Sequence, residues 1–166
     1  MPTVFDGELF ADYHQFYLAD AGAVATAEPT PWTDADVGRR LHPEDRLVAI
    51  STARNMTVPV RVELHDAAPA LDLAEADHLV QGSLLTAGEV VIAGCTDYLP
   101  DAARFNAPPG HLRVLAVFSG LGTISEDGLE GDDRYVLHLW PGQAVAVTVH
   151  RQWDDPAESL AAGPAA

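Results

Sequence analysis

The chain has 166 residues, which suits one domain, and its 25 acidic and 9 basic residues give a net charge of −16. The single cysteine, Cys95, excludes an internal disulfide and a multi-thiolate metal site, and the absence of lysine excludes Schiff-base chemistry. A surface of this charge repels nucleic acid and anionic lipid and attracts basic partners. The alternative is that the acidic composition only keeps the protein soluble.

The N-terminal residues predict a cytoplasmic protein. They contain no basic segment followed by an apolar core, and no apolar run in the sequence approaches the length of a membrane span. We therefore expect neither secretion nor membrane insertion, and the lone cysteine fits a reducing compartment.

The first part of the chain predicts one strand, one loop and one short helix. Residues 9–18 are rich in aromatic side chains, which is typical of a strand. Residues 19–31 are small and include proline, which indicates a loop. Thr33 precedes two aspartates and has the character of a helix N-cap, so a short helix is expected over 33–41.

Four strands are predicted in the middle of the chain, over 46–51, 57–64, 78–85 and 89–95. In the second of these, valines alternate with polar residues, so one face is expected to be exposed, and Pro59 favours an edge position or a bulge. The acidic, alanine-rich segment after residue 64 predicts a loop, and residues 96–110 have an irregular pattern.

The region from His111 to Trp140 predicts a long hairpin. Residues 111–119 and 134–141 are two apolar runs, typical of strands buried on both faces. The segment between them is rich in glycine, and its five carboxylates are expected to be exposed at a negative tip. A last strand is expected over 143–149, and an acidic flexible tail over 154–166.

These elements predict an all-β fold. Eight or nine short strands with one minor helix and no repeat indicate an antiparallel β-sandwich, with a jelly-roll-like or barrel form as the variant. The sandwich is expected to form a single domain over residues 1–153.

The sequence does not predict a metal, a cofactor or a catalytic residue. It holds seven histidines but no HxH or HxxxH pair, and a metal site on strands would need a close histidine pair. His14 and His138 lie in apolar patterns, where a buried, hydrogen-bonded histidine is common. Cys95 ends an apolar strand and is more typical of a core residue than of a reactive thiol.

The acidic segment between the hairpin strands is the predicted partner-binding region. Its spacing is not that of an EF-hand loop, which argues against calcium. One interpretation is that the tip is simply solvated. The other is that its carboxylates imitate a row of phosphates and enter the basic cleft of a nuclease. The residues proposed for this contact are Glu126, Asp127, Glu130, Asp132 and Asp133.

Several short motifs, in this order, resemble the competence protein J family. They are Tyr13, His14, Gln15 and Phe16, then Trp32 with Asp34, then Arg54 and Asn55 at a strand-to-strand turn, then Pro109-Gly110. The family includes the DNA-entry nuclease inhibitor of competent bacteria, a small acidic protein that binds and restrains its nuclease. The resemblance spans most of residues 8 to 141 and implies an all-β, non-catalytic protein.

Three functional hypotheses follow. The first is a binding protein that inhibits a basic partner, such as a nuclease or a toxin-like enzyme. The second is a small-ligand or metal-dependent enzyme, if His14, His138, Phe16, Tyr135 and other aromatic side chains line one cavity. The third is an interaction module without an inhibitory role.

Overall fold

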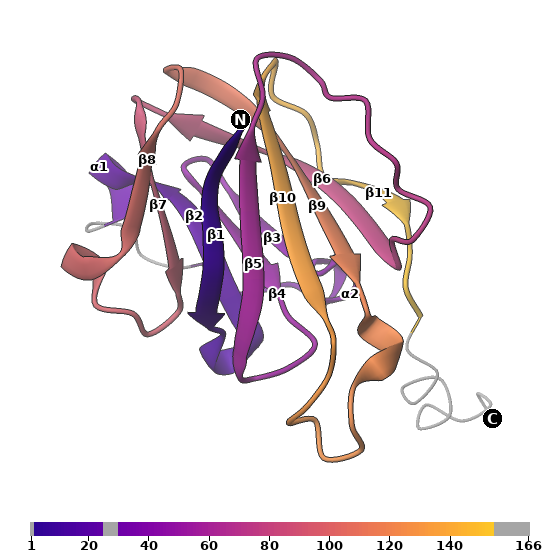
Figure 1. Cartoon of the computed structure of the whole chain (residues 1–166). Coiled ribbons are helices and arrows are strands. Elements are labelled where there is room, and N and C mark those ends of the chain that lie inside the picture. The colour runs from indigo at the N-terminus through magenta and orange to yellow at the C-terminus, as the bar shows by residue number, and fades with distance from the viewer. Residues whose placement is uncertain (1, 25–29, 155–166) are drawn as a thin grey trace.

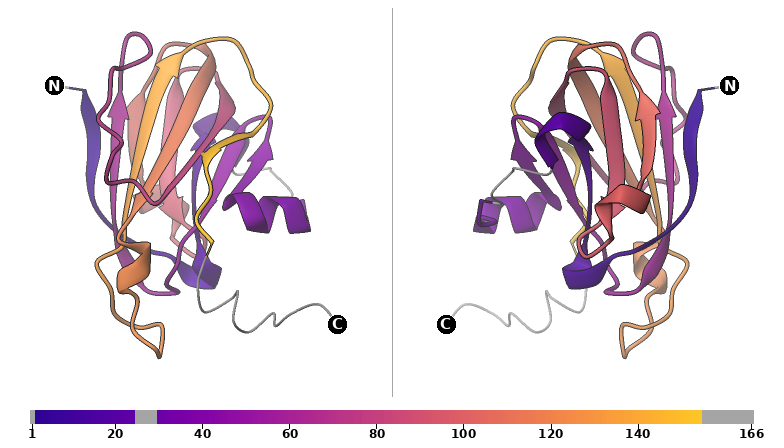
Figure 2. Two further views of the ribbon diagram at one scale, coloured as in Figure 1. Left: turned by 90° about the vertical axis from the view of Figure 1, so that its right-hand side faces the viewer. Right: turned by 90° about the vertical axis from the view of Figure 1, so that its left-hand side faces the viewer.

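The computed structural model describes residues 2–24 and 30–154, which form two β-sheets packed face to face (Figures 1 and 2). The strands are β1 (Thr3–Phe10), β2 (Gln15–Asp20), β3 (Leu41–Glu44), β4 (Leu47–Ser51), β5 (Thr57–Leu64), β6 (His78–Thr86), β7 (Glu89–Gly94), β8 (Ala103–Asn106), β9 (Gly110–Ser119), β10 (Arg134–Pro141) and β11 (Thr148–Arg151). One sheet has the order β1-β5-β10-β9-β6-β11, and the other has the order β3-β4-β2-β7-β8. The predicted all-β sandwich is confirmed.

All neighbouring strands pair antiparallel except β5 and β10, which are parallel. The predicted hairpin is β9 and β10, whose ladder runs from Arg134 opposite Ser119 to Pro141 opposite Leu112. Because β5 lies parallel to β10, the carboxyl ends of these two strands meet at the end of the sheet opposite the loop that joins β9 to β10 (Figure 1).

Helices contribute little to the described part of the chain. They are α1 (Ala21–Val24) and α2 (Asp34–Arg39), with single 3-10 turns η1 (Asp12–His14), η2 (Leu99–Asp101) and η3 (Leu121–Thr123). The predicted helix is confirmed as α2, which begins at a capping box. Thr33 Oγ1 accepts from Asp36 N at 3.1 Å, and Asp36 Oδ2 accepts from Thr33 N at 3.0 Å. None of the helices described is long and apolar enough to cross a membrane.

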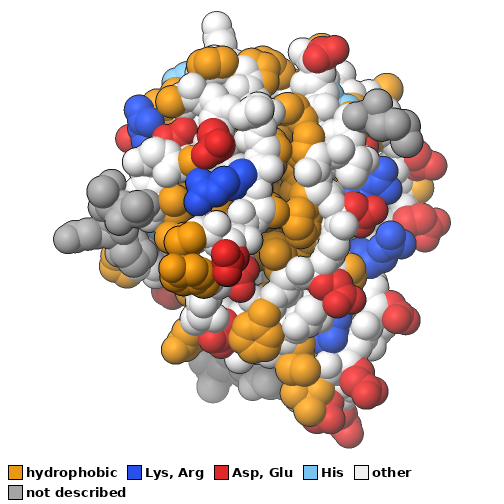
Figure 3. All heavy atoms as spheres, turned by 60° about the vertical axis from the view of Figure 1, so that its left-hand side comes forward, with side chains coloured by type: hydrophobic (Ala, Val, Ile, Leu, Met, Phe, Trp, Pro, Cys, Tyr) orange, Lys and Arg blue, Asp and Glu red, His pale blue; other side chains and the backbone are white. Residues whose placement is uncertain are grey.

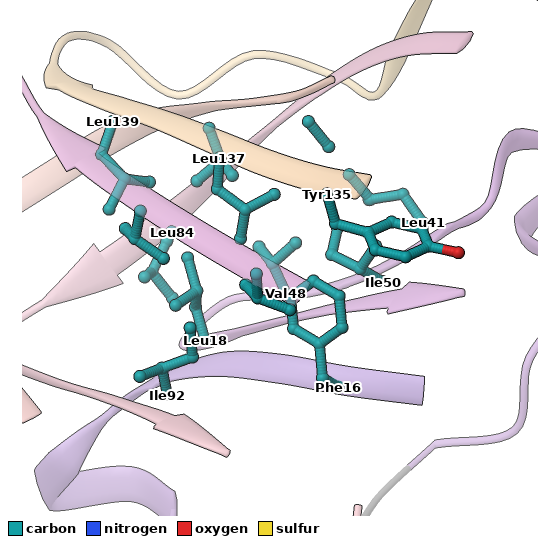
Figure 4. Close-up of a cluster of buried hydrophobic side chains, with 14 of the residues drawn as sticks. Phe16, Leu18, Leu41, Val48, Ile50, Leu84, Ile92, Tyr135, Leu137 and Leu139 are labelled. Atoms are coloured by element: carbon teal, nitrogen blue, oxygen red, sulfur yellow. The ribbon is translucent and has the colours of Figure 1, made fainter. Parts of the chain in front are cut away.

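The core lies between the two sheets (Figure 4). In the six-stranded sheet, alternate residues of the hairpin point inward, and Tyr135, Leu137 and Leu139 are almost fully buried. The facing sheet contributes Phe16 and Leu18 of β2. Strand alternation therefore selects one apolar face per sheet, and removing these faces from water stabilises the sandwich.

The prediction of one strand over 9–18 is wrong. Tyr13 and His14 have positive φ angles of 57° and 60°, which no strand residue adopts, and the chain turns there through η1 between β1 and β2. The Asp12 carboxylate stabilises this turn because its Oδ1 accepts from Tyr13 N at 3.1 Å. The two strands consequently belong to different sheets.

Other details also differ from the sequence predictions. Strand β5 lies between β1 and β10, which contradicts an edge position for Pro59. Pro59 lies one residue before Val60, where the pairing of β5 with β10 begins. Strands β1, β3 and β8 and helix α1 were not expected, and the last strand begins at Thr148 rather than at residue 143. Of the predicted tail, residues 155–166 lie outside the described residues.

Candidate functional site

The acidic loop, residues 120–133 between β9 and β10, is folded by its own hydrogen bonds. Ser125 N donates to Glu130 O at 2.8 Å, which closes the base of the tip. Within the tip, Asp127 Oδ1 accepts from Ser125 Oγ at 2.6 Å and from Leu129 N at 3.0 Å. These bonds, from Ser125 first, hold the pKa of Asp127 below its ordinary value. The loop therefore presents its side chains in a defined arrangement.

Four of the five predicted carboxylates are exposed on this loop. They belong to Glu126, Asp127, Glu130 and Asp132. Leu129 lies among them with 51% of its surface exposed, so the tip combines negative charge with one apolar side chain. Figure 3 shows acidic side chains at the lower tip of the molecule with hydrophobic side chains beside them.

The prediction of an exposed Asp133 is wrong. Its side chain is fully buried at the base of the acidic loop. Asp133 Oδ1 accepts from Arg54 Nε at 2.6 Å, and Oδ2 accepts from the Tyr135 hydroxyl at 2.6 Å. A carboxylate can be buried when it is paired with a cation and its oxygens are hydrogen-bonded, and both conditions hold here. Asp133 anchors the loop and does not face a partner.

Arg54 joins the acidic loop to the turn between β4 and β5. Its Nη1 donates to Leu129 O at 3.2 Å, in addition to the bond from Nε to Asp133. Tyr135 closes the same network, because its hydroxyl oxygen accepts from Ala53 N at 2.8 Å. Burial, reinforced by the bond to Asp133, raises the pKa of Tyr135 well above its ordinary value, so the phenol stays protonated and donates.

His14 lies beside this turn but is exposed, so the expectation of a buried histidine is wrong at this position. Its Nδ1 lies 3.2 Å from Thr52 O, and Thr52 N donates to His14 O at 2.8 Å. The neighbouring Tyr13 is 68% exposed. The η1 turn therefore displays an aromatic ring and an imidazole at the same end of the sandwich as the acidic loop (Figure 1).

A cleft of about 400 Å³ opens at this end, and we call it the end cleft. Its walls come from η1, α2, the turn after β4, the acidic loop and the segment after β11. They include His14, Arg40, Thr52, Ile124 and Trp153. The cleft lies between two segments that the sequence singled out, the histidine of η1 and the loop after β9.

A second hollow of about 430 Å³ lies on the outer face of the five-stranded sheet, and we call it the outer groove. Gln15 and Trp32 line it together with Cys95. Trp32 stacks on His42 with ring centroids 5.3 Å apart, and His42 Nδ1 lies 2.8 Å from Asp36 Oδ2. Cys95 is exposed rather than in the core, which corrects the sequence interpretation.

The residues that carry the family resemblance are therefore spread over several places. Tyr13, His14, Arg54 and the exposed Asn55 gather beside the acidic loop, Gln15 and Trp32 lie in the outer groove, and Phe16 is buried in the core. Asp34 occupies the exposed first turn of α2. His14 and His138 do not face a common cavity, because His138 lies on the outer face of the six-stranded sheet.

Sequence reasoning missed one histidine pair. His138 of β10 is buried as expected, but its Nδ1 lies 3.0 Å from Nε2 of His65, which follows β5. Glu63 completes a group that could hold a metal ion. Burial lowers the pKa of His138 below its ordinary value. No local motif reveals this pair, because 73 residues separate the two histidines.

Comparison with known proteins identifies structures that share the fold of this chain. No protein-family model and no curated protein sequence matches it. The crystal structure of ComJ from Bacillus subtilis, an inhibitor of the DNA degrading activity of NucA, is similar with a TM-score of 0.65 and 16% identity, covering 84% of this chain and 97% of that one. The structure described as crocagin biosynthetic gene J is similar with a TM-score of 0.56 and 22% identity, covering 83% and 96%. The resemblance to competence protein J is confirmed as a shared fold.

Proposed function

We propose that this chain is a non-catalytic protein that binds a basic enzyme, such as a nuclease, and inhibits it. The observation that carries the proposal is the acidic loop, a projecting tip that bears exposed carboxylates and whose backbone is held by internal hydrogen bonds and by a buried anchor. The fold shared with ComJ, described as an inhibitor of the DNA degrading activity of NucA, supports the same role.

The chemistry of the tip suits a site that normally receives a phosphate backbone. Glu126, Glu130 and Asp132 present oxygen atoms and negative charge, as phosphates do, and the net charge of −16 extends the attraction to a basic partner over a longer range. Leu129 adds apolar area that leaves water on contact. Because the loop is already ordered, it loses less conformational entropy on binding than a flexible segment would.

The end cleft lies beside the tip and extends the proposed contact surface. Tyr13, next to the cleft residue His14 on η1, is exposed and supplies an aromatic side chain of the kind that dominates protein interfaces. A partner that covers the tip would therefore also meet η1 and the turn that carries Arg54 and Asn55. This arrangement gives the motif residues beside the acidic loop, Tyr13, His14 and Asn55, a place in the proposed contact.

The experiment measures DNA degradation by purified NucA, and by nucleases from the protein's own source, in the presence of this protein. The test variant carries Glu126→Gln, Glu130→Gln and Asp132→Asn. Asp127 is left unchanged because it holds the fold of the loop. The control carries Asp66→Asn, Glu75→Gln and Asp101→Asn, three exposed carboxylates outside the loop, so both variants change the net charge equally.

We expect the wild type and the control to inhibit a nuclease and the loop variant to lose at least tenfold in affinity. Equal inhibition by all three proteins would show that the nuclease contacts a surface other than the acidic loop. Failure to inhibit any nuclease, with no nuclease retained from lysate at low salt, would overturn the inhibitory role.

A further inference from the structure

The parallel pairing of β5 and β10 brings together three side chains that can bind a metal. Glu63 lies directly opposite His138 in the register, and side chains of opposed residues point to the same face. His65 follows two residues after Glu63, so it shares that face. Its backbone N donates to Leu139 O at 2.7 Å, which holds the end of β5 against β10.

The donor atoms are already close to one another. His65 Nε2 lies 3.0 Å from His138 Nδ1, and the two rings are stacked with centroids 5.3 Å apart. Glu63 Oε1 lies 4.0 Å from His65 Nε2, and each of the three residues offers one ligand atom within 4.8 Å of the other two. Two nitrogens bound to one tetrahedral zinc ion at ~2.0–2.1 Å lie about 3.3 Å apart, so the pair needs to open only slightly.

The surroundings shield the group from water and orient its carboxylate. The side chains of Glu63 and His65 are only 17% and 16% exposed, and His138 is 6% exposed, so a metal ion there would be largely shielded from water while one side stays accessible. Arg61 Nε lies 3.4 Å from Glu63 Oε2, the oxygen that does not face His65. This contact orients the carboxylate, as outer partners of metal ligands commonly do.

We propose that Glu63, His65 and His138 bind one divalent transition-metal ion of the zinc class, with a fourth position open to solvent. Two imidazoles and one carboxylate are the donor set that zinc accepts in sites with an open position. The ion would link β5 to β10 at the end of the sheet opposite the acidic loop, so it stabilises the sandwich independently of the proposed partner contact.

The test titrates the metal-free full-length protein with Zn²⁺ by calorimetry and with Co²⁺ by visible absorption. The variants are His65→Gln, His138→Gln and Glu63→Gln. The matched control is His111→Gln, which removes an exposed histidine outside the group. We expect one ion per chain, at least a tenfold loss of affinity in each variant and no change in the control.

Thermal unfolding with and without Zn²⁺ provides the second measurement. We expect the melting temperature of the wild type and the control to rise with Zn²⁺ and that of His138→Gln to stay constant. Circular dichroism of the metal-free variants separates loss of binding from loss of folding, and His65→Gln, at a part-exposed position, serves if His138→Gln does not fold. Binding of no stoichiometric metal by the wild type, or equal affinity in all variants, would overturn the site.

Discussion

Asp133 and Arg54 form a buried ion pair whose two members cannot be separated without penalty. Asp133→Asn keeps the shape of the side chain but leaves the Arg54 guanidinium, of which only 10% is exposed, without a counterion. Removing one partner of a buried pair commonly costs about 3–5 kcal/mol. We therefore expect the free energy of unfolding to fall by about 3 kcal/mol, measured by urea denaturation.

Asp132→Asn is the matched comparison because it changes the same functional group one position away, on an exposed residue. A surface substitution of this kind changes stability by about 0.5 kcal/mol or less. If the two variants unfold at the same urea concentration, the buried pair does not anchor the acidic loop.

His78 makes the C-terminal segment sensitive to acid. The imidazole is fully buried, its Nε2 donates to Arg39 O at 2.8 Å, and its Nδ1 accepts from Trp153 N at 3.1 Å. Only the neutral ring can make both bonds, because a proton on Nδ1 would face another N–H donor. Burial accordingly lowers the pKa of His78 below 6.5.

The sign of the pH effect follows from this shift. Below pH 6.5 the unfolded chain takes up a proton at His78 that the folded chain does not, so stability falls as the pH falls toward the lowered folded pKa. We expect the free energy of unfolding to decrease between pH 7.5 and pH 5.5, and to decrease less in His78→Gln. An identical decrease in both proteins would assign the acid sensitivity to other groups.

At the scale of elements, the base of the acidic loop depends on Gly120. Gly120 and Gly128 both have positive φ angles, of 70° and 74°, so alanine strains the backbone similarly at each, by about 1–2 kcal/mol. A Cβ at Gly120 would also collide with the backbone O of Asp132, whereas a Cβ at Gly128 meets no atom within 4 Å.

We therefore expect Gly120→Ala to destabilise the protein clearly more than Gly128→Ala does, and to weaken nuclease inhibition because the loop shifts. Thermal unfolding of the two variants measures the first effect, and the DNA degradation assay measures the second. Equal melting temperatures would mean that the loop accommodates a Cβ at residue 120 without additional loss of stability.

The same elements explain which parts of the fold could be predicted from sequence. Strands β5, β9 and β10 were predicted within one residue of their bounds because apolar residues recur in them over eight to ten positions. Strands β3 and β8 have four residues each, too few for a period to be visible. Apolar and polar residues alternate only weakly in β1. The boundary at η1 depends on positive φ angles at Tyr13 and His14, which the aromatic residues around them do not predict.

The candidate sites depend on contacts between distant residues. Arg54 and Asp133 are 79 residues apart, and the pairing of β5 with β10 aligns Glu63 with His138. Alternation along a strand assigns side chains to faces but does not identify neighbouring strands. Exposure of Glu126, Glu130 and Asp132 could be predicted because turn residues and charge surround them, whereas the burial of Asp133 required its partner to be known.

At the scale of the whole molecule, the net charge of −16 and the projecting acidic loop act on different steps of the proposed binding. Long-range attraction accelerates encounter with a basic partner and is screened by salt, with a Debye length of about 10 Å at 0.1 M. Contacts that form after docking, through Leu129 and Tyr13, instead control how long the complex lasts.

We expect the association rate with a basic nuclease to fall about tenfold or more between 50 mM and 500 mM salt, while the dissociation rate changes little. Leu129→Ala should do the opposite, leaving association unchanged and accelerating dissociation, because it removes apolar contact without altering charge. Surface plasmon resonance across a salt series measures both rates, with Asp66→Asn/Glu75→Gln/Asp101→Asn as the control for net charge. Salt-independent association would contradict electrostatic attraction, and dissociation unaffected by Leu129→Ala would place the short-range contact elsewhere on the sandwich.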